Sequence, residues 1–147
     1  PPRPRNRPGN SRRAGRFFPV RLPLVTTTQR RRAWRRGWFA ESICAASLMC
    51  RGYRILARRQ RCPVGEIDIV ARRSGVLAII EVKARPTHTQ AMEAVTRRQQ
   101  DRLVRAAQWY VASRPALATL ALRFDVMSVT PWRPPRHLTD AWRPGLG

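Results

Sequence analysis

The stretch from residue 65 to residue 83, GEIDIVARRSGVLAIIEVK, constrains the fold of this chain more than any other segment. Acidic and apolar residues alternate over residues 66–71, whereas residues 76–84 are apolar and partly β-branched. Arg-Arg-Ser-Gly lies between these two arms and is suited to a turn. Alternation and β-branched residues are typical of strands, so the stretch predicts a β-hairpin.

The predicted hairpin gathers charged side chains on one of its faces. Because side chains in a strand alternate between faces, Glu81 and Lys83 must point the same way. If residue 72 pairs with residue 75, Asp68 lies diagonally from Glu81 on that same face. Three of the eight acidic residues and the only lysine of the chain lie in this stretch. The hairpin therefore predicts a cluster of two carboxylates and one ammonium.

Such a cluster has a chemical use. Carboxylates a few ångströms apart repel one another, and a hard divalent cation, above all Mg²⁺, relieves the repulsion while keeping water ligands. A lysine beside the cation can orient or deprotonate an attacking water and stabilise charge that develops on a phosphate. The pattern therefore favours phosphodiester hydrolysis.

The same residues resemble a known nuclease signature. Asp68, twelve intervening residues and Glu81-Val82-Lys83 are similar to the D…ExK motif of the PD-(D/E)xK superfamily, although Ile67 replaces its proline. The segments GYRILARRQRCPVGEIDIVARR, IIEVKAR, AVTRRQQDRLVRAAQWYV and RFDVMSV resemble the YraN-type family of uncharacterised, endonuclease-like bacterial proteins. This resemblance covers about residues 36–130.

The resemblance implies a metal site and a set of catalytic residues. Asp68, Glu81 and the Val82 main-chain carbonyl would hold Mg²⁺ or Mn²⁺, and Lys83 would position the nucleophilic water. Glu41 aligns with the glutamate of the family's first helix, which often supports a second metal or its water. The alternative for Glu41 is a solvated helix residue that pairs with nearby arginines.

Glu66 has two interpretations. It shares a face with Asp68 in the alternating pattern and is therefore a candidate ligand. It could equally bind an arginine. His88 is a candidate general base because imidazole exchanges protons near neutral pH, but solvation is the commoner state of a loop histidine. Family members commonly carry a lysine near Gln99, so no role is assigned to Gln99.

The order of predicted elements defines an α/β fold class. It is αβββαβ, which resembles the restriction-endonuclease-like core, with a mixed central sheet flanked by helices. Thr96 is the expected N-cap of the second long helix, and Gly52 the expected end of the first. The predicted segments are a helix over 33–51, strands over 53–61, 66–71, 76–84 and 120–130, a loop or helical turn over 85–95, and a helix over 96–113.

Both ends of the chain are predicted to lie outside this domain. Residues 1–33 contain many Arg and Pro and no acid, which predicts a disordered basic extension. A transit peptide, a basic arm and an upstream extension from a wrongly chosen start site are the alternatives. Residues 34–130 form the endonuclease-like domain, and residues 131–147 are expected to be a flexible tail. Tryptophan and arginine mix in that tail, so base stacking is an alternative to fraying.

The charge of the chain points to a polyanionic partner. A formal net charge of +22 and a pI near 12 favour nucleic acid, with DNA favoured over RNA. Codon bias is the alternative, because all basic residues except one lysine are arginine. Against this background, a lysine inside ExK indicates a need for a compact ammonium. Arg85, Arg97 and Arg98 are the candidate phosphate contacts.

Cysteine usage and hydropathy indicate the compartment. Cys44, Cys50 and Cys62 are odd in number and lack CxxC spacing, which favours a reduced, cytoplasmic location. Zinc binding by these cysteines with His88 or His137 is a weaker alternative. A transmembrane helix needs an apolar run of about 18 residues or more, and none is found, so no membrane partner is expected.

These observations support two main hypotheses. The first is a metal-dependent nuclease acting on DNA or RNA. Structured or branched DNA is a candidate substrate by analogy with Holliday-junction resolvases, and a branched substrate would favour a homodimer. The second is a non-catalytic nucleic-acid-binding module that keeps the nuclease fold, and a partner-scaffold role is a third.

Overall fold

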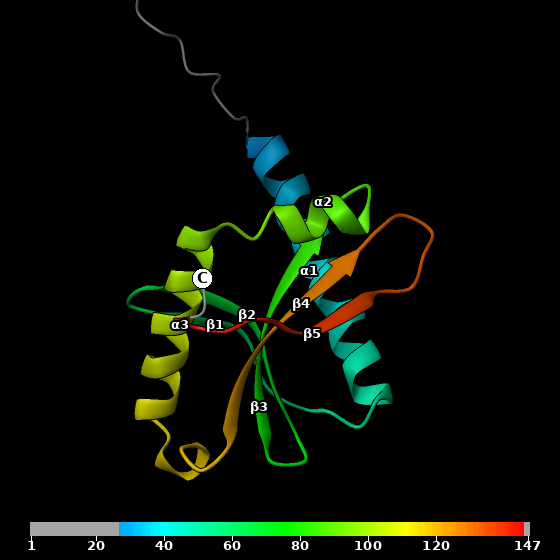
Figure 1. Ribbon diagram of the computed structural model, residues 1–147. Helices are drawn as coiled ribbons and strands as arrows, with labels where there is room; N and C mark the ends of the chain where they lie inside the picture. Colours follow the sequence, from blue (N-terminus) through cyan, green and yellow to red (C-terminus); the bar gives the residue numbers. More distant parts are fainter. Residues whose placement is uncertain (1–26, 146–147) are drawn as a thin grey trace, which may run out of the picture.

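The structure, a computed structural model, describes residues 27–145, with side chains from residue 37 onward. A five-stranded sheet in the order β1-β2-β3-β4-β5 forms its centre (Figure 1). The helices are α1 (Thr27–Cys50), α2 (His88–Glu93), α3 (Arg97–Ala112) and the 3-10 helix η1 (Pro115–Leu117). The strands are β1 (Arg54–Cys62), β2 (Gly65–Arg73), β3 (Val76–Ala84), β4 (Ala121–Val129) and β5 (Arg136–Trp142).

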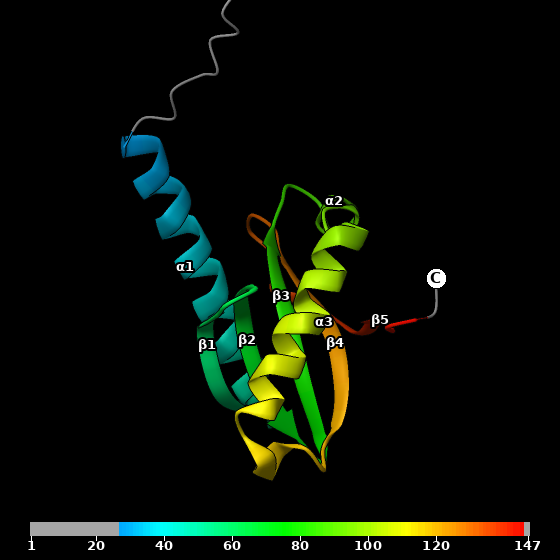
Figure 2. The same ribbon diagram turned by 90° about the vertical axis from the view of Figure 1, so that its left-hand side faces the viewer.

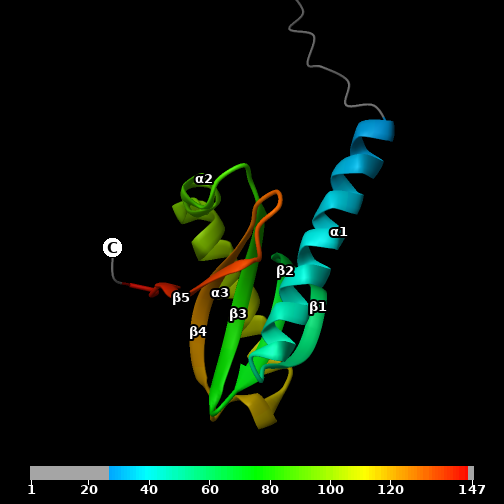
Figure 3. The same cartoon turned by 90° about the vertical axis from the view of Figure 1, so that its right-hand side faces the viewer.

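Helices cover both faces of the sheet, so the predicted α/β class with a mixed, helix-flanked sheet is confirmed (Figures 2 and 3). β3 and β4 pair in parallel, and the other neighbours are antiparallel. The core between the sheet and α1 consists mainly of Cys44, Ala45, Leu48, Tyr53, Ile69, Ala71, Ala78, Ile80 and Met127. The core on the α3 face consists of Ile67, Val70, Leu77, Ile79, Leu103, Ala106, Ala107, Tyr110 and Phe124.

The hairpin of β2 and β3 closes with a two-residue turn. Ser74 and Gly75 both have positive φ angles, of 44° and 77°, which is the pattern of a type I′ turn. Arg73 therefore pairs with Val76. The predicted pairing of residue 72 with residue 75 is wrong, because the two residues with positive φ are Ser74 and Gly75, so the turn lies one residue later than expected.

The corrected register moves the two carboxylates closer together. The ladder between β2 and β3 runs to the pair Ile69 and Ile80. One step further along the same register, Asp68 lies directly opposite Glu81 and not diagonally from it. This position would be a non-hydrogen-bonded pair, where opposing side chains are nearest to one another.

The parallel pairing of β3 with β4 brings a distant segment to the same end of the sheet. A parallel pair needs a long crossover connection, which α2, α3 and η1 supply. Lys83 then pairs with Ser128, so the loop that follows β4 lies beside the end of the ExK motif. The predicted N-cap of α3 is confirmed, because the Thr96 hydroxyl accepts a hydrogen bond from the Gln99 N–H.

The first helix begins before its predicted start at residue 33. It runs from Thr27, so residues 27–33 of the predicted disordered extension are helical. The rest of that extension, residues 1–26, lies outside the described residues. Gly52, with φ 81°, follows the helix as predicted, and its N–H donates to the Met49 carbonyl. No helix within residues 27–145 has the length and apolar composition needed to cross a membrane.

The prediction of a flexible tail is wrong for residues 136–142, which form β5 along the edge of β4. Buried Asp125 on β4 fixes this strand. Its carboxylate accepts hydrogen bonds from Arg123, from His137 Nε2 at 2.8 Å and from the Asp140 N–H at 2.9 Å. Burial alone would raise the pKa of Asp125, but these donors lower it below its usual value. Trp142 also stacks on Phe124, with ring centroids 5.4 Å apart.

We expect Asp125→Asn to destabilise the fold by about 2–4 kcal/mol near neutral pH, because a neutral amide leaves buried donors poorly paired. Because folding lowers the pKa of Asp125, its contribution is present above about pH 4 and is lost as the pH falls through the folded value. Urea denaturation of both proteins from neutral to acidic pH measures this difference. Asp101→Asn, at an exposed position on α3, is the control. A gap between Asp125→Asn and wild type that stays constant down to low pH would contradict the account.

Candidate active site

The candidate active site lies where the β2–β3 ladder ends. Glu81 is only 4% exposed, and its Oε1 accepts a hydrogen bond from Lys83 Nζ at 2.7 Å. This contact confirms that Glu81 and Lys83 share a face. Gln99, in the first turn of α3, donates its side-chain amide to the same oxygen. The start of α3 is therefore held against the ExK strand.

Asp68 replaces a main-chain partner at this point of the sheet. Its Oδ2 accepts a hydrogen bond from the Val82 N–H at 2.8 Å, where β3 would otherwise bond to the backbone of β2. The N–H and C=O of one residue in a ladder point to the same neighbouring strand. The Val82 carbonyl therefore also faces the region where β2 turns away. The structure thus brings Asp68, Glu81 and the Val82 main chain to one place.

The electrostatics of the site show mutual repulsion. Burial, together with the nearby charges of Glu81 and Glu41, raises the pKa of Asp68 to about 7, and the Val82 hydrogen bond and Lys83 oppose this shift. Burial also raises the pKa of Glu41, with Arg59 opposing the shift and Glu66 and Glu81 adding to it. The glutamate of α1 therefore belongs to the same electrostatic cluster as the two carboxylates of the hairpin.

Two carboxylate oxygens in this cluster have unsatisfied bonding capacity. Glu41 Oε2 and Glu81 Oε2 are buried and have no hydrogen-bond partner among the described residues. An unpaired buried carboxylate oxygen costs free energy that a cation would recover. No three His, Cys, Asp or Glu side chains within residues 37–145 form a preassembled metal cluster. A cation here would thus use two carboxylates, a carbonyl and water, which fits the preference of Mg²⁺ for oxygen ligands and retained water.

Arg59 contacts both of the glutamates that were predicted to assist the site, Glu41 and Glu66. It has a positive φ of 49° within β1, and its guanidinium contacts Glu41 at 3.2 Å and Glu66 at 3.1 Å. The second oxygen of Glu66 contacts Arg61 at 3.5 Å. Both glutamates therefore pair with arginines, as the alternative interpretation of each residue predicted. Glu41 retains an unpaired buried oxygen, whereas both oxygens of Glu66 are engaged.

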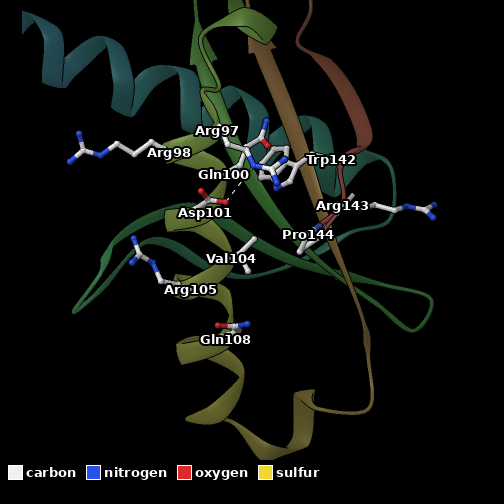
Figure 4. Close-up of a pocket in the computed structure, with 11 residues that line it drawn as sticks. Arg97, Arg98, Gln100, Asp101, Val104, Arg105, Gln108, Trp142, Arg143 and Pro144 are labelled. Atoms are coloured by element: carbon white, nitrogen blue, oxygen red, sulfur yellow. Dashed lines mark ion pairs between the residues drawn. The ribbon is translucent and has the colours of Figure 1, made fainter. Parts of the chain in front are cut away.

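The predicted phosphate-binding arginines lie around the carboxylates and not among them. Arg97 and Arg98 are exposed and line a pocket of about 540 Å³ between α3 and the end of β5. Figure 4 shows the ion pair of Arg97 with Asp101, at 3.8 Å, while Arg98 and Arg143 extend away from each other. Arg85 is exposed just beyond Lys83, at the end of β3.

Some site contacts were not predicted from the sequence. Gln99 had no assigned role, although a polar residue three positions after an N-cap beside the ExK strand could have indicated its contact with Glu81. His88 is not simply solvated, because its Nδ1 lies 2.5 Å from Ser128 Oγ, opposite Lys83 in the sheet. Cys44, Cys50 and Cys62 are free, and within residues 37–145 they form no preassembled metal-binding cluster with a histidine.

A mixed sheet between helices, with D…ExK side chains where a central hairpin ends, defines the restriction-endonuclease-like class of α/β fold. Comparison with known proteins then identifies the family of the chain. It belongs to the uncharacterised protein family UPF0102, whose model matches residues 40–129.

Relatives in this family cover most of the chain. A UPF0102 protein of Bradyrhizobium diazoefficiens is 51% identical over 120 residues, which is 82% of this chain and 90% of the relative. One from Parvibaculum lavamentivorans is 51% identical over 112 residues, 76% of this chain and 84% of the relative. One from Nitrobacter winogradskyi is 52% identical over 110 residues, 75% of this chain and 93% of the relative.

We expect Asp68→Asn to stabilise the protein in EDTA. Folding raises the pKa of Asp68 from its ordinary value to about 7, so wild type loses stability as the pH rises through this range. The amide removes the charge but can still accept the Val82 hydrogen bond. The gain should be near zero at about pH 4 and about 1–3 kcal/mol above pH 7. Thermal or urea denaturation across this range measures it. Equal pH dependence in both proteins would exclude the predicted repulsion.

Proposed function

We propose that this protein is a metal-dependent nuclease that hydrolyses phosphodiester bonds in nucleic acid, with DNA favoured over RNA. The observation that carries the proposal is the meeting of Asp68, Glu81 and Lys83, with a buried Glu81 oxygen that has no partner among the described residues. The oxygens of a buried structural carboxylate normally all accept hydrogen bonds. The free oxygen of Glu81 can instead bind a cation.

Asp68, Glu81 and the Val82 carbonyl would hold Mg²⁺ or Mn²⁺. When bound, such an ion supplies positive charge at the phosphate and lowers the pKa of a coordinated water. Lys83 uses one of its three donors on Glu81, and its side chain is 14% exposed. Its remaining donors can orient a water or contact a phosphate oxygen. Gln99 keeps the carboxylate of Glu81 oriented. Glu41 adds negative charge near Asp68.

The charge distribution supports a nucleic-acid substrate. The chain has a formal charge of +22, and exposed arginines lie on the start of α3 and at the end of β3. A module that only binds nucleic acid would gain nothing from buried, mutually repelling carboxylates, because they would weaken phosphate binding. The observed cluster therefore favours a nuclease over the non-catalytic alternative.

The direct test is cleavage of labelled single-stranded, duplex, flap and four-way-junction DNA, with matching RNA, in Mg²⁺, Mn²⁺ or EDTA. We expect cutting by wild type only with the metal, and none by Asp68→Ala. Lys83→Ala should lower the cleavage rate about 100- to 1000-fold because a charge-stabilising donor is lost, while affinity changes little. Glu93→Ala removes an exposed carboxylate that forms no ion pair among the described residues, and it should behave as wild type. Binding without cutting on every substrate would favour the non-catalytic module, and preference for the junction would support a homodimer.

We expect the double variant Arg97→Ala, Arg98→Ala to bind nucleic acid more weakly than wild type. Each lost phosphate contact should reduce the slope of log affinity against log salt by about 0.9, or about 1.8 for two contacts. Fluorescence anisotropy at several salt concentrations measures this slope. The matched control is Arg54→Ala, Arg72→Ala, an exposed pair at the opposite end of the sheet. Equal slopes for both double variants would show that the charge effect is nonspecific.

A further inference from the structure

A large apolar groove lies at the same end of the sheet as the candidate active site. It has a volume of about 880 Å³ and is formed by α1, the residues after β3 and the loop from β4 to β5. Figure 3 shows this loop near the end of β3 and on the side of the sheet that α1 covers. Phe39 and Trp132 are both exposed in the groove, at 62% and 102%.

The groove and the carboxylate cluster share their supporting elements. Ala40 lines the groove and directly precedes Glu41, and Ala84 lines it one residue after Lys83. The parallel pairing of Lys83 with Ser128 brings the residues after β4 to the same end of the sheet. The groove and the carboxylate cluster therefore lie at the same end of the sheet, with the groove on the face that α1 covers.

The lining of the groove indicates the chemistry of its ligand. Apolar and aromatic side chains make up most of it, the charged residues are Arg85 and Arg133, and none of the described lining residues is acidic. Aromatic surfaces next to guanidinium groups are suited to a flat ring attached to an anion. A nucleotide has this combination, with its base as the ring and its phosphate as the anion.

Trp132 has a conformation that the fold itself does not explain. Its φ is 60°, a left-handed backbone conformation that bulky L-residues rarely adopt, and its side chain is fully exposed. Neither burial nor packing compensates for this strain. Backbone strain at an exposed aromatic residue is more typical of a binding site than of a structural element. Thr130, which also lines the groove, has a buried hydroxyl with no partner among the described residues.

We propose that this groove binds an unpaired nucleobase of the substrate, stacked on Trp132 and Phe39, while Arg85 and Arg133 contact the adjoining phosphates. The inference rests on the proposed nuclease function and narrows its substrate class. A paired base lies inside its duplex and cannot enter a groove. The enzyme therefore acts on nucleic acid that has a single-stranded nucleotide near the cut position, in preference to continuous duplex.

A cycle between protein and DNA variants tests this inference. The probe is a labelled duplex with a short single-stranded branch, compared with versions in which one branch base at a time is replaced by an abasic analogue. Anisotropy in EDTA measures affinity without cleavage. The affinity of wild type should fall about 5- to 100-fold when the base at one position is missing. Trp132→Ala should bind intact DNA more weakly than wild type by a similar factor. Its affinity should not fall further when that same base is missing.

Two further variants control for indirect effects. Trp109 is an exposed tryptophan on α3 that does not line the groove, so Trp109→Ala should bind as wild type. Trp132→Gly should weaken binding as much as Trp132→Ala does, yet its thermal midpoint should equal or exceed that of wild type, because glycine accepts a positive φ. Loss of affinity accompanied by a lower midpoint in both Trp132 variants would overturn the proposal.

The outcomes separate this inference from the proposed function. Metal-dependent cleavage by wild type, with no coupling between Trp132 and any base, would overturn the stacking groove and leave the nuclease intact. Coupling without cleavage on any substrate would support the groove and contradict the nuclease. A DNA-free dimer that Trp132→Ala dissociates, without base coupling, would assign the groove to a second copy of the chain and overturn the proposal.

Discussion

The repulsion among Asp68, Glu81 and Glu41 is the constraint on which the arrangement of this protein depends. All three lie in buried or partly buried positions, and burial and neighbouring carboxylates raise the pKa of Asp68 and of Glu41. Holding such groups together costs free energy that the rest of the fold must supply. The two apolar cores supply it, because they fix β2 and β3 from both faces of the sheet and hold α1 against one face. The site therefore lowers the stability of the fold, and the two apolar cores hold its residues in place.

Turn geometry and strand direction convert this constraint into a site. The Ser74-Gly75 turn sets the register that places Asp68 opposite Glu81, because a shift of one residue would send one of them to the other face. The crossover through α3 then delivers Gln99 to Glu81 and returns the chain parallel to β3. The loop after β4 consequently reaches the same end of the sheet. The proposed base-stacking groove is thus a consequence of the same topology.

The local patterns were sufficient to predict the hairpin, the shared face of Glu81 and Lys83, and the N-cap at Thr96. The register was missed, because sequence patterns do not show that Ser74 accepts a positive φ. β5 was missed because polar contacts to Asp125 hold it, and such contacts between distant residues leave no hydrophobic period. The bond from Gln99 to Glu81 was missed for the same reason. Contacts between residues of different helices and strands could not be predicted, because the local sequence pattern does not determine them.

The treatment of Asp125 shows what distinguishes a structural acid in this chain from one available for chemistry. Asp125 is fully buried, and its two oxygens accept four hydrogen bonds, two of them from Arg123. Glu81 is almost as deeply buried, yet its two donors share one oxygen and the other has none among the described residues. A chain with 30 basic residues does not lack cations to pair with it. Its incomplete pairing is therefore better explained by a ligand that must enter than by a shortage of partners.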